Sequence, residues 1–130
     1  MVLVASLVAL IGSLAADILL VAVGTRVFPS TKGYVHFQFL DYSRLTVIGV
    51  IVACVGWPLV TRLSSTPRWL FLRLAVVVTV VLFAPDVYIW YQGSSATAVV
   101  VLVWMHVAIA IVTYYSLVKL APVPRGRHAR

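Results

Sequence analysis

The sequence predicts an all-α membrane protein, a bundle of four transmembrane helices with both termini in the cytoplasm. Hydrophobic residues make up 63% of its 130 residues and charged residues only 10%, and the mean hydropathy is +1.10. A soluble domain carries roughly a quarter charged residues. The apolar residues also form four runs, each near the ~20 residues that cross a hydrocarbon core of ~30 Å. Lipid is therefore the expected solvent for most of the chain.

The four apolar runs cover residues 2–24, 45–60, 70–91 and 97–118. We expect them to form one transmembrane domain, residues 1–120, followed by a basic, disordered tail at residues 121–130. No basic region precedes the first run, so a retained helix is expected there rather than a cleaved signal peptide. Thr66 followed by Pro67 is typical of an N-cap with proline at the first helical position. Pro58 and Pro85 are expected to end or kink their helices.

The distribution of Lys and Arg predicts the orientation, because these residues are enriched in cytoplasmic loops. Arg26 after the first run favours, by itself, an external N-terminus. Over the whole chain, however, seven of the ten basic residues share the side of the termini, which favours a multi-pass protein of the plasma (inner) membrane with both termini inside. The expected cytoplasmic anchors are Arg62, Arg68, Arg73, Lys119, Arg125, Arg127 and Arg130, and the outer basic residues are Arg26, Lys32 and Arg44.

The net charge of +7 favours the anionic lipid bilayer as a partner. Nucleic acid is not an expected partner, because the basic residues lie at helix ends and form no single basic face. Aromatic residues at the ends of the runs are typical of interfacial belts. They are Trp69 and Phe71 on one side, and Tyr88, Trp90 and Tyr91 on the other.

Small residues at helical spacing predict where the helices pack, since close approach in lipid requires them. In the first run Ala5, Ala9 and Ser13 lie four residues apart, and Asp17 continues the row, so Asp17 is expected on a packed face. The second run has Gly49, Ala53 and Gly56, and the fourth has Ala108, Ala110 and Thr113. We interpret all three patterns as packing surfaces.

Three ionisable residues fall within the apolar runs: Asp17, Asp86 and His106. At ~1.5 Å per residue, they lie about 22, 24 and 18 Å from the cytoplasmic ends of their helices. They therefore form one layer near the middle or in the outer half of the membrane. A charge at the bilayer centre costs at least ~2.5–3.5 kcal/mol, so each needs a partner or water. One carboxylate paired with the imidazolium, with the second carboxyl protonated or hydrated, would meet this need.

Two interpretations of this polar layer remain open. The layer is either a proton or cation site or a polar clamp that holds the helices in register. For Asp86 and His106 we favour the clamp. Asp17 is enclosed most deeply by apolar sequence and is the best single candidate for function.

The sequence contains no motif that indicates an enzyme, a cofactor or a metal site. Cys54 is the only cysteine, so neither a disulfide nor a CxxC motif is possible. A haem held by His36 and His106 is not expected, because no second buried histidine faces His106. We therefore predict no enzyme activity, no cofactor and no metal.

Several short motifs from the second run to the fourth carry a family resemblance. They are Val47-Ile-Gly-Val50, Gly56-Trp57, Pro67-Arg-Trp69, Phe83-Ala-Pro-Asp86 and Val103-Trp-Met-His106. This part of the chain resembles a group of small actinobacterial four-helix membrane proteins, classified only as a domain of unknown function. The resemblance implies the fold and the compartment but no activity. The small multidrug transporters also have four spans and an acid in the first, but that acid is Glu in a different pattern, so the likeness is an analogy.

These observations favour an accessory or scaffold subunit of a larger membrane assembly, bound to another membrane protein or to copies of itself. The alternative is a small oligomeric proton-coupled transporter or channel that uses Asp17, Asp86 and His106. A more distant possibility is a membrane enzyme acting on a lipid.

Overall fold

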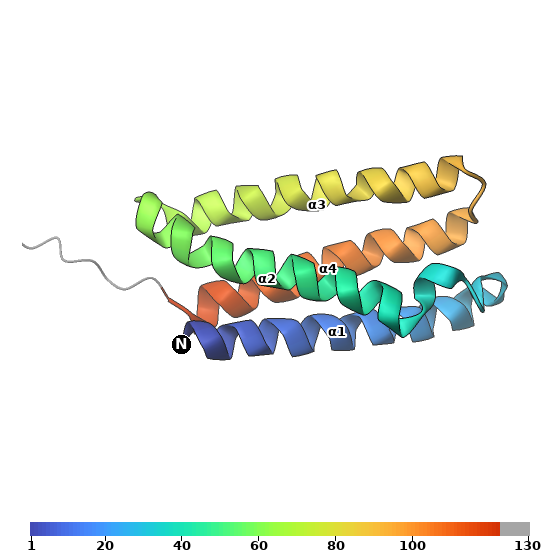
Figure 1. Cartoon of the computed structure of the whole chain (residues 1–130), viewed down its shortest axis with the longest axis horizontal. Coiled ribbons are helices and arrows are strands. Elements are labelled where there is room, and N and C mark those ends of the chain that lie inside the picture. Colours follow the sequence, from blue (N-terminus) through green and yellow to red (C-terminus); the bar gives the residue numbers. More distant parts are fainter. Residues whose placement is uncertain (123–130) are drawn as a thin grey trace, which may run out of the picture.

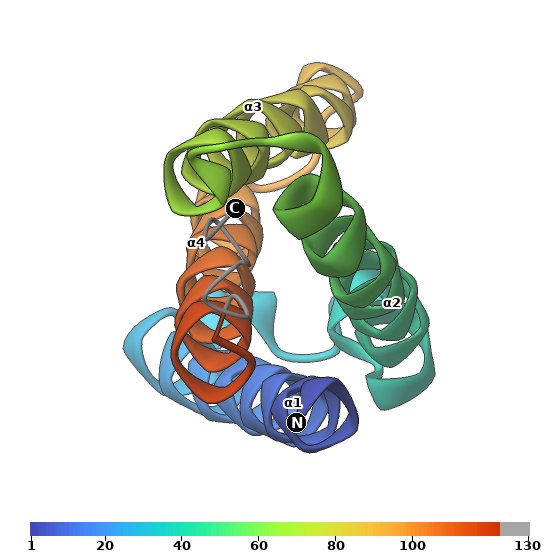
Figure 2. The same ribbon diagram turned by 90° about the vertical axis from the view of Figure 1, so that its left-hand side faces the viewer.

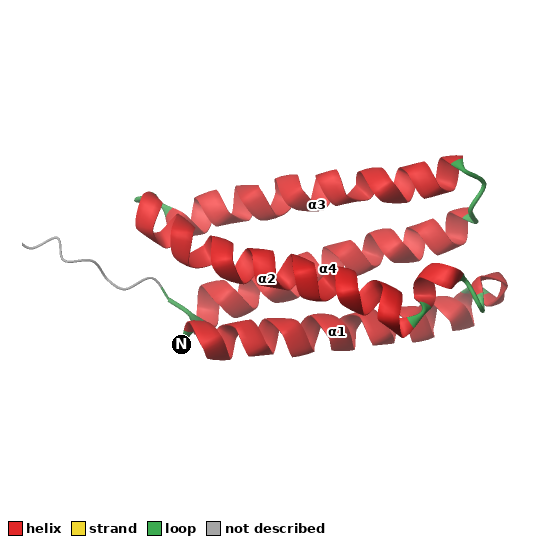
Figure 3. Ribbon diagram, in the orientation of Figure 1, coloured by secondary structure: helices red, strands yellow, loops and turns green. Residues whose placement is uncertain are grey.

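A computed structural model describes residues 1–122, which form four long helices and two short 3-10 helices and contain no strand (Figure 3). The long helices are α1 (Val2–Val27), α2 (Phe39–Leu63), α3 (Pro67–Tyr91) and α4 (Ala96–Leu120). The short ones, η1 (Pro29–Thr31) and η2 (Val35–Phe37), lie in the connection between α1 and α2. All four long helices are long and apolar enough to cross a membrane. The predicted all-helical architecture is confirmed.

Successive helices run in opposite directions along the bundle (Figure 1). The start of α1, the turn between α2 and α3, and the end of α4 therefore lie together, at what we call the terminal end. The α1–α2 connection and the α3–α4 turn lie at the opposite, loop end. Seen along the bundle, the helices lie around a ring in the order α1, α2, α3, α4, and α2 and α3 diverge from their connecting turn (Figure 2).

Helix α2 extends further than its apolar run suggested, and neither Pro58 nor Pro85 ends its helix. Helix α2 begins at Phe39 rather than near residue 45, and it passes through Pro58 to Leu63. Helix α3 likewise continues through Pro85 to Tyr91. A proline removes one backbone donor, and neighbouring helices and polar groups in membrane bundles compensate for that loss. Thr66 is the N-cap of α3 with Pro67 at its first position, as predicted, although its side chain makes no capping bond.

A hydrophobic cluster at the terminal end joins all four helices through Ala5, Trp57, Phe71 and Leu117. The Trp57 ring lies 5.0 Å from the Phe71 ring, which stacks on Tyr114 at 5.9 Å. Phe71 is thus buried, and its predicted place in an interfacial belt is wrong. Its ring fills the space between α2 and α4 and does not face outward.

A second cluster, at the loop end, joins η2, α2 and α4 through Phe37, Tyr42, Leu102 and Met105. Between the two clusters, the inner faces of α1, α2 and α4 carry buried polar side chains. These are Ser13, Asp17, Thr46 and Thr113.

The outer surface of the bundle is apolar. Leu3, Ile11 and Leu45 are 81%, 66% and 70% exposed, and many other Leu, Ile and Val side chains on all four helices are also exposed. A water-soluble monomer rarely exposes large contiguous apolar surface. The surface therefore fits a hydrocarbon environment and is compatible with a multi-pass membrane protein.

Candidate functional site

One face of α1 positions the first site residue. Ala5, Ala9, Ser13 and Asp17 follow one another at intervals of four residues, and each is 0% exposed. The predicted packed face of α1 is therefore confirmed, with Asp17 on it.

Small residues let α4 approach this part of α1 closely. A Cβ atom placed on Gly24 would lie 2.8 Å from Cγ2 of Val101, and one on Gly12 would lie 2.9 Å from Cγ1 of Val112. These two glycines allow α1 and α4 to form the most extensive helix pair of the bundle. Thr113 on α4 is buried as expected, whereas Ala108 and Ala110 are only half-buried.

The predicted packing face of α2 is wrong for its two glycines, although Ala53 packs against the cluster at the terminal end. Gly49 is exposed, and an added Cβ at Gly49 or Gly56 would meet no atom within 4 Å. Helix α2 instead buries larger side chains, Tyr42, Thr46 and Trp57, against the bundle. These side chains fill the interior, so close approach through glycine does not occur on α2.

The Asp17 carboxylate is held by a residue from α2. The hydroxyl of Thr46 donates a hydrogen bond to Oδ2 of Asp17 over 2.5 Å, and Thr46 is itself 2% exposed. The other oxygen, Oδ1, is buried and has no hydrogen-bond partner among residues 1–122. One turn away, the hydroxyls of Ser13 and Thr113 share a 3.3 Å hydrogen bond between α1 and α4. Asp17 thus lies in a small buried set of oxygen-bearing side chains.

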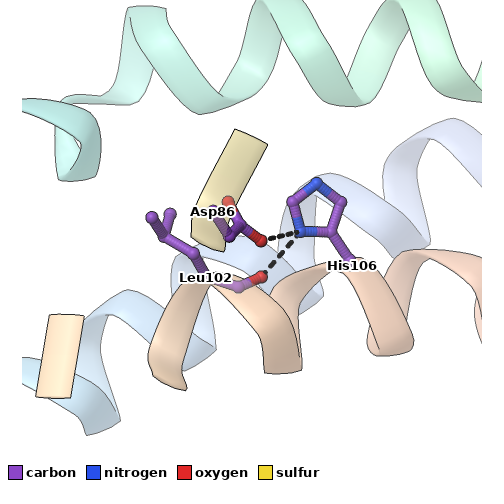
Figure 4. Close-up of polar contacts among 3 residues, drawn as sticks. All are labelled: Asp86, Leu102 and His106. Atoms are coloured by element: carbon purple, nitrogen blue, oxygen red, sulfur yellow. Dashed lines mark hydrogen bonds and ion pairs between the residues drawn. The ribbon is translucent and has the colours of Figure 1, made fainter. Parts of the chain in front are cut away.

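Asp86 and His106 form a second polar contact, between α3 and α4 (Figure 4). Oδ2 of Asp86 lies 3.1 Å from Nδ1 of His106, and the carbonyl oxygen of Leu102 lies 2.9 Å from the same nitrogen. The ring N–H is directed at the Leu102 carbonyl, so Oδ2 of Asp86 receives no well-aligned hydrogen bond. The contact becomes an ion pair when the imidazole is protonated. The ring of Phe83 packs edge-on against the imidazole, with centroids 6.2 Å apart.

The three ionisable residues predicted from the sequence therefore all point into the bundle, but not as one contact cluster. Asp86 touches His106, whereas Asp17 bonds to Thr46. Asp17 and His106 lie in the same stretch of the α1–α4 pair, between the Ser13–Thr113 hydrogen bond and the close approach of Gly24 to Val101. Asp86 is 4% exposed, and the His106 side chain is 22% exposed.

Sequence reasoning missed Thr46 and the Leu102 carbonyl. Placing the start of the second span at residue 45 put Thr46 at the membrane edge, where a hydroxyl needs no partner. Because α2 begins at Phe39, Thr46 lies two turns inside the helix. The spacing of Tyr42, Thr46 and Val50 was the available signal, since residues four apart share one helical face.

The basic anchors lie at the helix ends. Arg62, Arg68, Arg73 and Lys119 are all exposed at the terminal end, while Arg26, Lys32 and Arg44 are exposed at the loop end. The guanidinium of Arg73 lies 3.4 Å from the centroid of the Trp69 ring, and the Lys119 ammonium 5.2 Å from that of Tyr115. Such contacts are typical of the interface between lipid and water.

The expected tail falls largely outside the described residues, and Arg125, Arg127 and Arg130 lie there. Its first residue, Ala121, is 3% exposed, and its carbonyl accepts a 2.9 Å hydrogen bond from Nε1 of Trp57.

The chemistry available in the buried layer is proton binding. A carboxylate and an imidazole are groups that exchange protons, and Asp17 retains an oxygen free to take one. Within residues 1–122, no three His, Cys, Asp or Glu side chains are placed to hold a metal ion. Comparison of the chain with models of protein families, with curated proteins and with solved structures gives no match.

Proposed function

We propose that this chain is a small proton-coupled membrane protein, an oligomeric transporter or channel that uses Asp17, Asp86 and His106. The observation that carries the proposal is the state of Asp17. Its carboxylate is 0% exposed, and one of its oxygens has no partner among the described residues. A purely structural clamp would be expected to use both oxygens, because an unsatisfied buried acceptor costs about 1–3 kcal/mol.

The charge balance of the layer supports proton exchange. The layer holds two carboxylates, those of Asp17 and Asp86, and one imidazole, that of His106. Even with His106 protonated, one negative charge remains without a compensating positive one. Uptake of a single proton removes that charge, and release restores it. The energetic penalty for a buried charge thus makes the layer sensitive to protons.

The membrane and the orientation form part of this proposal. We place the chain in the plasma membrane with the terminal end in the cytoplasm, because that end carries Arg62, Arg68, Arg73 and Lys119. With this orientation the Asp86–His106 contact lies nearer to the outer side, since Asp86 is close to the loop end of α3. The resemblance to the actinobacterial family of unknown function stays a prediction and adds no activity.

Proton flux into liposomes tests the proposal. Purified protein is reconstituted, a potential is imposed, and acidification is followed with an enclosed pH-sensitive dye. We expect flux in the parent protein and its loss in Asp17→Asn, which keeps the shape of the side chain but cannot exchange protons. Asp41→Asn, at the loop end of α2, is the matched control and should retain flux. Flux no greater than in protein-free liposomes, or unchanged flux in Asp17→Asn, would overturn the proposal.

The accessory or scaffold role remains the second candidate, and the open surface around Gly49 and Gly56 favours it. These two glycines lie on a small-residue pattern suited to helix contact, yet a Cβ added at either would meet no atom of a neighbouring described helix within 4 Å. Purification in mild detergent followed by mass spectrometry separates the two functions. A stoichiometric partner protein would support the accessory role, and a homogeneous oligomer of this chain would count against it.

A further inference from the structure

The contacts of His106 determine which of its ring nitrogens exchanges protons. Nδ1 lies 2.9 Å from the carbonyl oxygen of Leu102 and 3.1 Å from a carboxylate oxygen of Asp86. A carbonyl oxygen only accepts hydrogen bonds, and so does an ionised carboxylate. Nδ1 therefore carries a hydrogen in both the neutral and the protonated ring. The nitrogen that gains and loses a proton is Nε2.

The surroundings of Nε2 leave it able to exchange a proton. It lies on the side of the ring away from Asp86 and the Leu102 carbonyl (Figure 4). Within residues 1–122 it has no hydrogen-bond partner, and the side chain is 22% exposed. Phe83 and the two contacts at Nδ1 fix the ring, so Nε2 keeps a constant direction. A fixed ring with one occupied and one open nitrogen is the arrangement that a proton donor or acceptor needs.

Asp17, on α1, is the group that can take this proton. On α1, Asp17 lies between Ser13 and Gly24, and on α4, His106 lies between Thr113 and Val101, the residues that meet Ser13 and Gly24. Both residues therefore lie in the same stretch of the α1–α4 pair, and Oδ1 of Asp17 has no partner among the described residues. The other titratable groups near these two are Asp86 on α3, which contacts His106, and Tyr42 on α2, which is buried one turn before Thr46. The Thr46 hydroxyl bonds to Oδ2 of Asp17 and leaves Oδ1 as the receiving atom.

We propose that His106 and Asp17 form a proton relay, in which Nε2 of His106 passes its proton, by way of water, to Oδ1 of Asp17. Asp86 and the Leu102 carbonyl are positioning groups that keep the hydrogen on Nδ1. The proposal deepens the proposed function and rests on it. Before transfer the relay holds an imidazolium and a carboxylate, and afterwards it holds a neutral Nδ1–H imidazole and a carboxylic acid. One proton moves, one N–H bond breaks, one O–H bond forms, and the net charge of the layer is unchanged.

The first test is 15N spectroscopy of histidine-labelled full-length protein in lipid bilayers, with the signal assigned from its loss in His106→Gln. Across a pH titration, Nδ1 of His106 should remain protonated while Nε2 changes from protonated to unprotonated. This tautomer is the less common one for histidine in water, so its presence reports the positioning contacts. A neutral ring that carries its proton on Nε2 would overturn the assignment of the exchanging atom.

The second test measures proton transfer to Asp17. The carboxyl infrared band of Asp17, identified by its loss in Asp17→Asn, is followed in time after a rapid pH drop. We expect its appearance to slow by on the order of a hundredfold in His106→Gln, as for removal of a proton-transfer group, and to keep its rate in His36→Gln. An unchanged rate in His106→Gln overturns the relay. Liposome flux that persists in that variant would then show that the proposed function uses a different proton path.

Discussion

The Thr46 hydroxyl donates a 2.5 Å hydrogen bond to Oδ2 of Asp17 and so connects α2 to the buried face of α1. Both residues are almost fully enclosed, at 2% and 0% exposed. The bond fixes the orientation of a carboxylate that is surrounded by apolar sequence. It also makes the two carboxylate oxygens different, because Oδ2 accepts a hydrogen bond and Oδ1 has no partner among the described residues. One hydroxyl thereby helps to anchor α2 and leaves Asp17 with a free acceptor.

Substitution Thr46→Val removes this hydrogen bond and keeps the side-chain shape. We expect the free energy of unfolding to fall by about 1–3 kcal/mol, because a buried carboxylate loses its only described hydrogen-bond donor. The measurement is denaturant unfolding of the purified protein in detergent. Thr79→Val is the matched control, since the Thr79 hydroxyl bonds to the Ala75 carbonyl within its own helix. Equal effects at the two positions would show that the interhelical bond adds no stability.

The Asp86–His106 contact should be measurable as a coupling energy. Asp86→Asn, His106→Gln and the double variant form a thermodynamic cycle for the 3.1 Å pair. We expect a coupling of about 0.5–3 kcal/mol, the range for residues in direct contact. The coupling should be larger at acidic pH, where the imidazole is charged and attracts the carboxylate. Additive effects at acidic pH would contradict the pairing of these two groups.

Gly24 and Gly49 should respond in opposite ways to alanine. At Gly24 the new Cβ would lie 2.8 Å from Cγ2 and 3.0 Å from Cγ1 of Val101, so the Val101 side chain or the helix backbones must shift. We expect Gly24→Ala to destabilise by about 1–3 kcal/mol. At Gly49 nothing lies within 4 Å, and alanine favours the helix by up to ~1 kcal/mol. Thermal unfolding of the two variants, each compared with the parent protein, tests both expectations. Destabilisation by Gly49→Ala would instead reveal a contact between copies or with a partner.

Trp57 packs its ring in the cluster at the terminal end, and its Nε1–H donates a hydrogen bond to the Ala121 carbonyl. Trp57→Phe retains an aromatic ring but leaves that buried carbonyl without its donor. We expect the free energy of unfolding to fall by about 1 kcal/mol in Trp57→Phe, from loss of the hydrogen bond. The fall should be larger in Trp57→Ala, about 3–5 kcal/mol. Trp104→Phe is the control, because Trp104 is 60% exposed. Similar effects of the two Phe variants would show that the buried bond is not a stabilising element.

Much of the fold could be predicted from the sequence, and the partners in the site could not. Four apolar runs fix four helices because lipid leaves few other structures possible. The Ala5–Ala9–Ser13–Asp17 row was predictable because one helical period places all four on one face. The same reasoning failed for Gly49 and Gly56, since a small-residue pattern does not reveal whether a neighbouring helix is present. The Thr46–Asp17 hydrogen bond depends on where α2 begins and on how α2 is rotated about its own axis. The pattern of apolar and polar residues within α2 determines neither.

The orientation of the bundle is open to direct measurement with single cysteines. Cys54 is the only cysteine of the chain, so Cys54→Ser provides a cysteine-free background. In this background Ser65→Cys lies in the turn at the terminal end, and Gln92→Cys follows α3 at the loop end. Both native residues are exposed.

The concentration of Arg62, Arg68, Arg73 and Lys119 at the terminal end predicts that this end is retained in the cytoplasm. A membrane-impermeant maleimide should therefore label Gln92→Cys in intact cells, and Ser65→Cys only after the membrane is disrupted. The reverse pattern would mean that Arg26, the basic residue in the last turn of α1, sets the orientation. The Asp86–His106 contact would then lie nearer to the cytoplasmic side, and protons would enter the relay from within the cell.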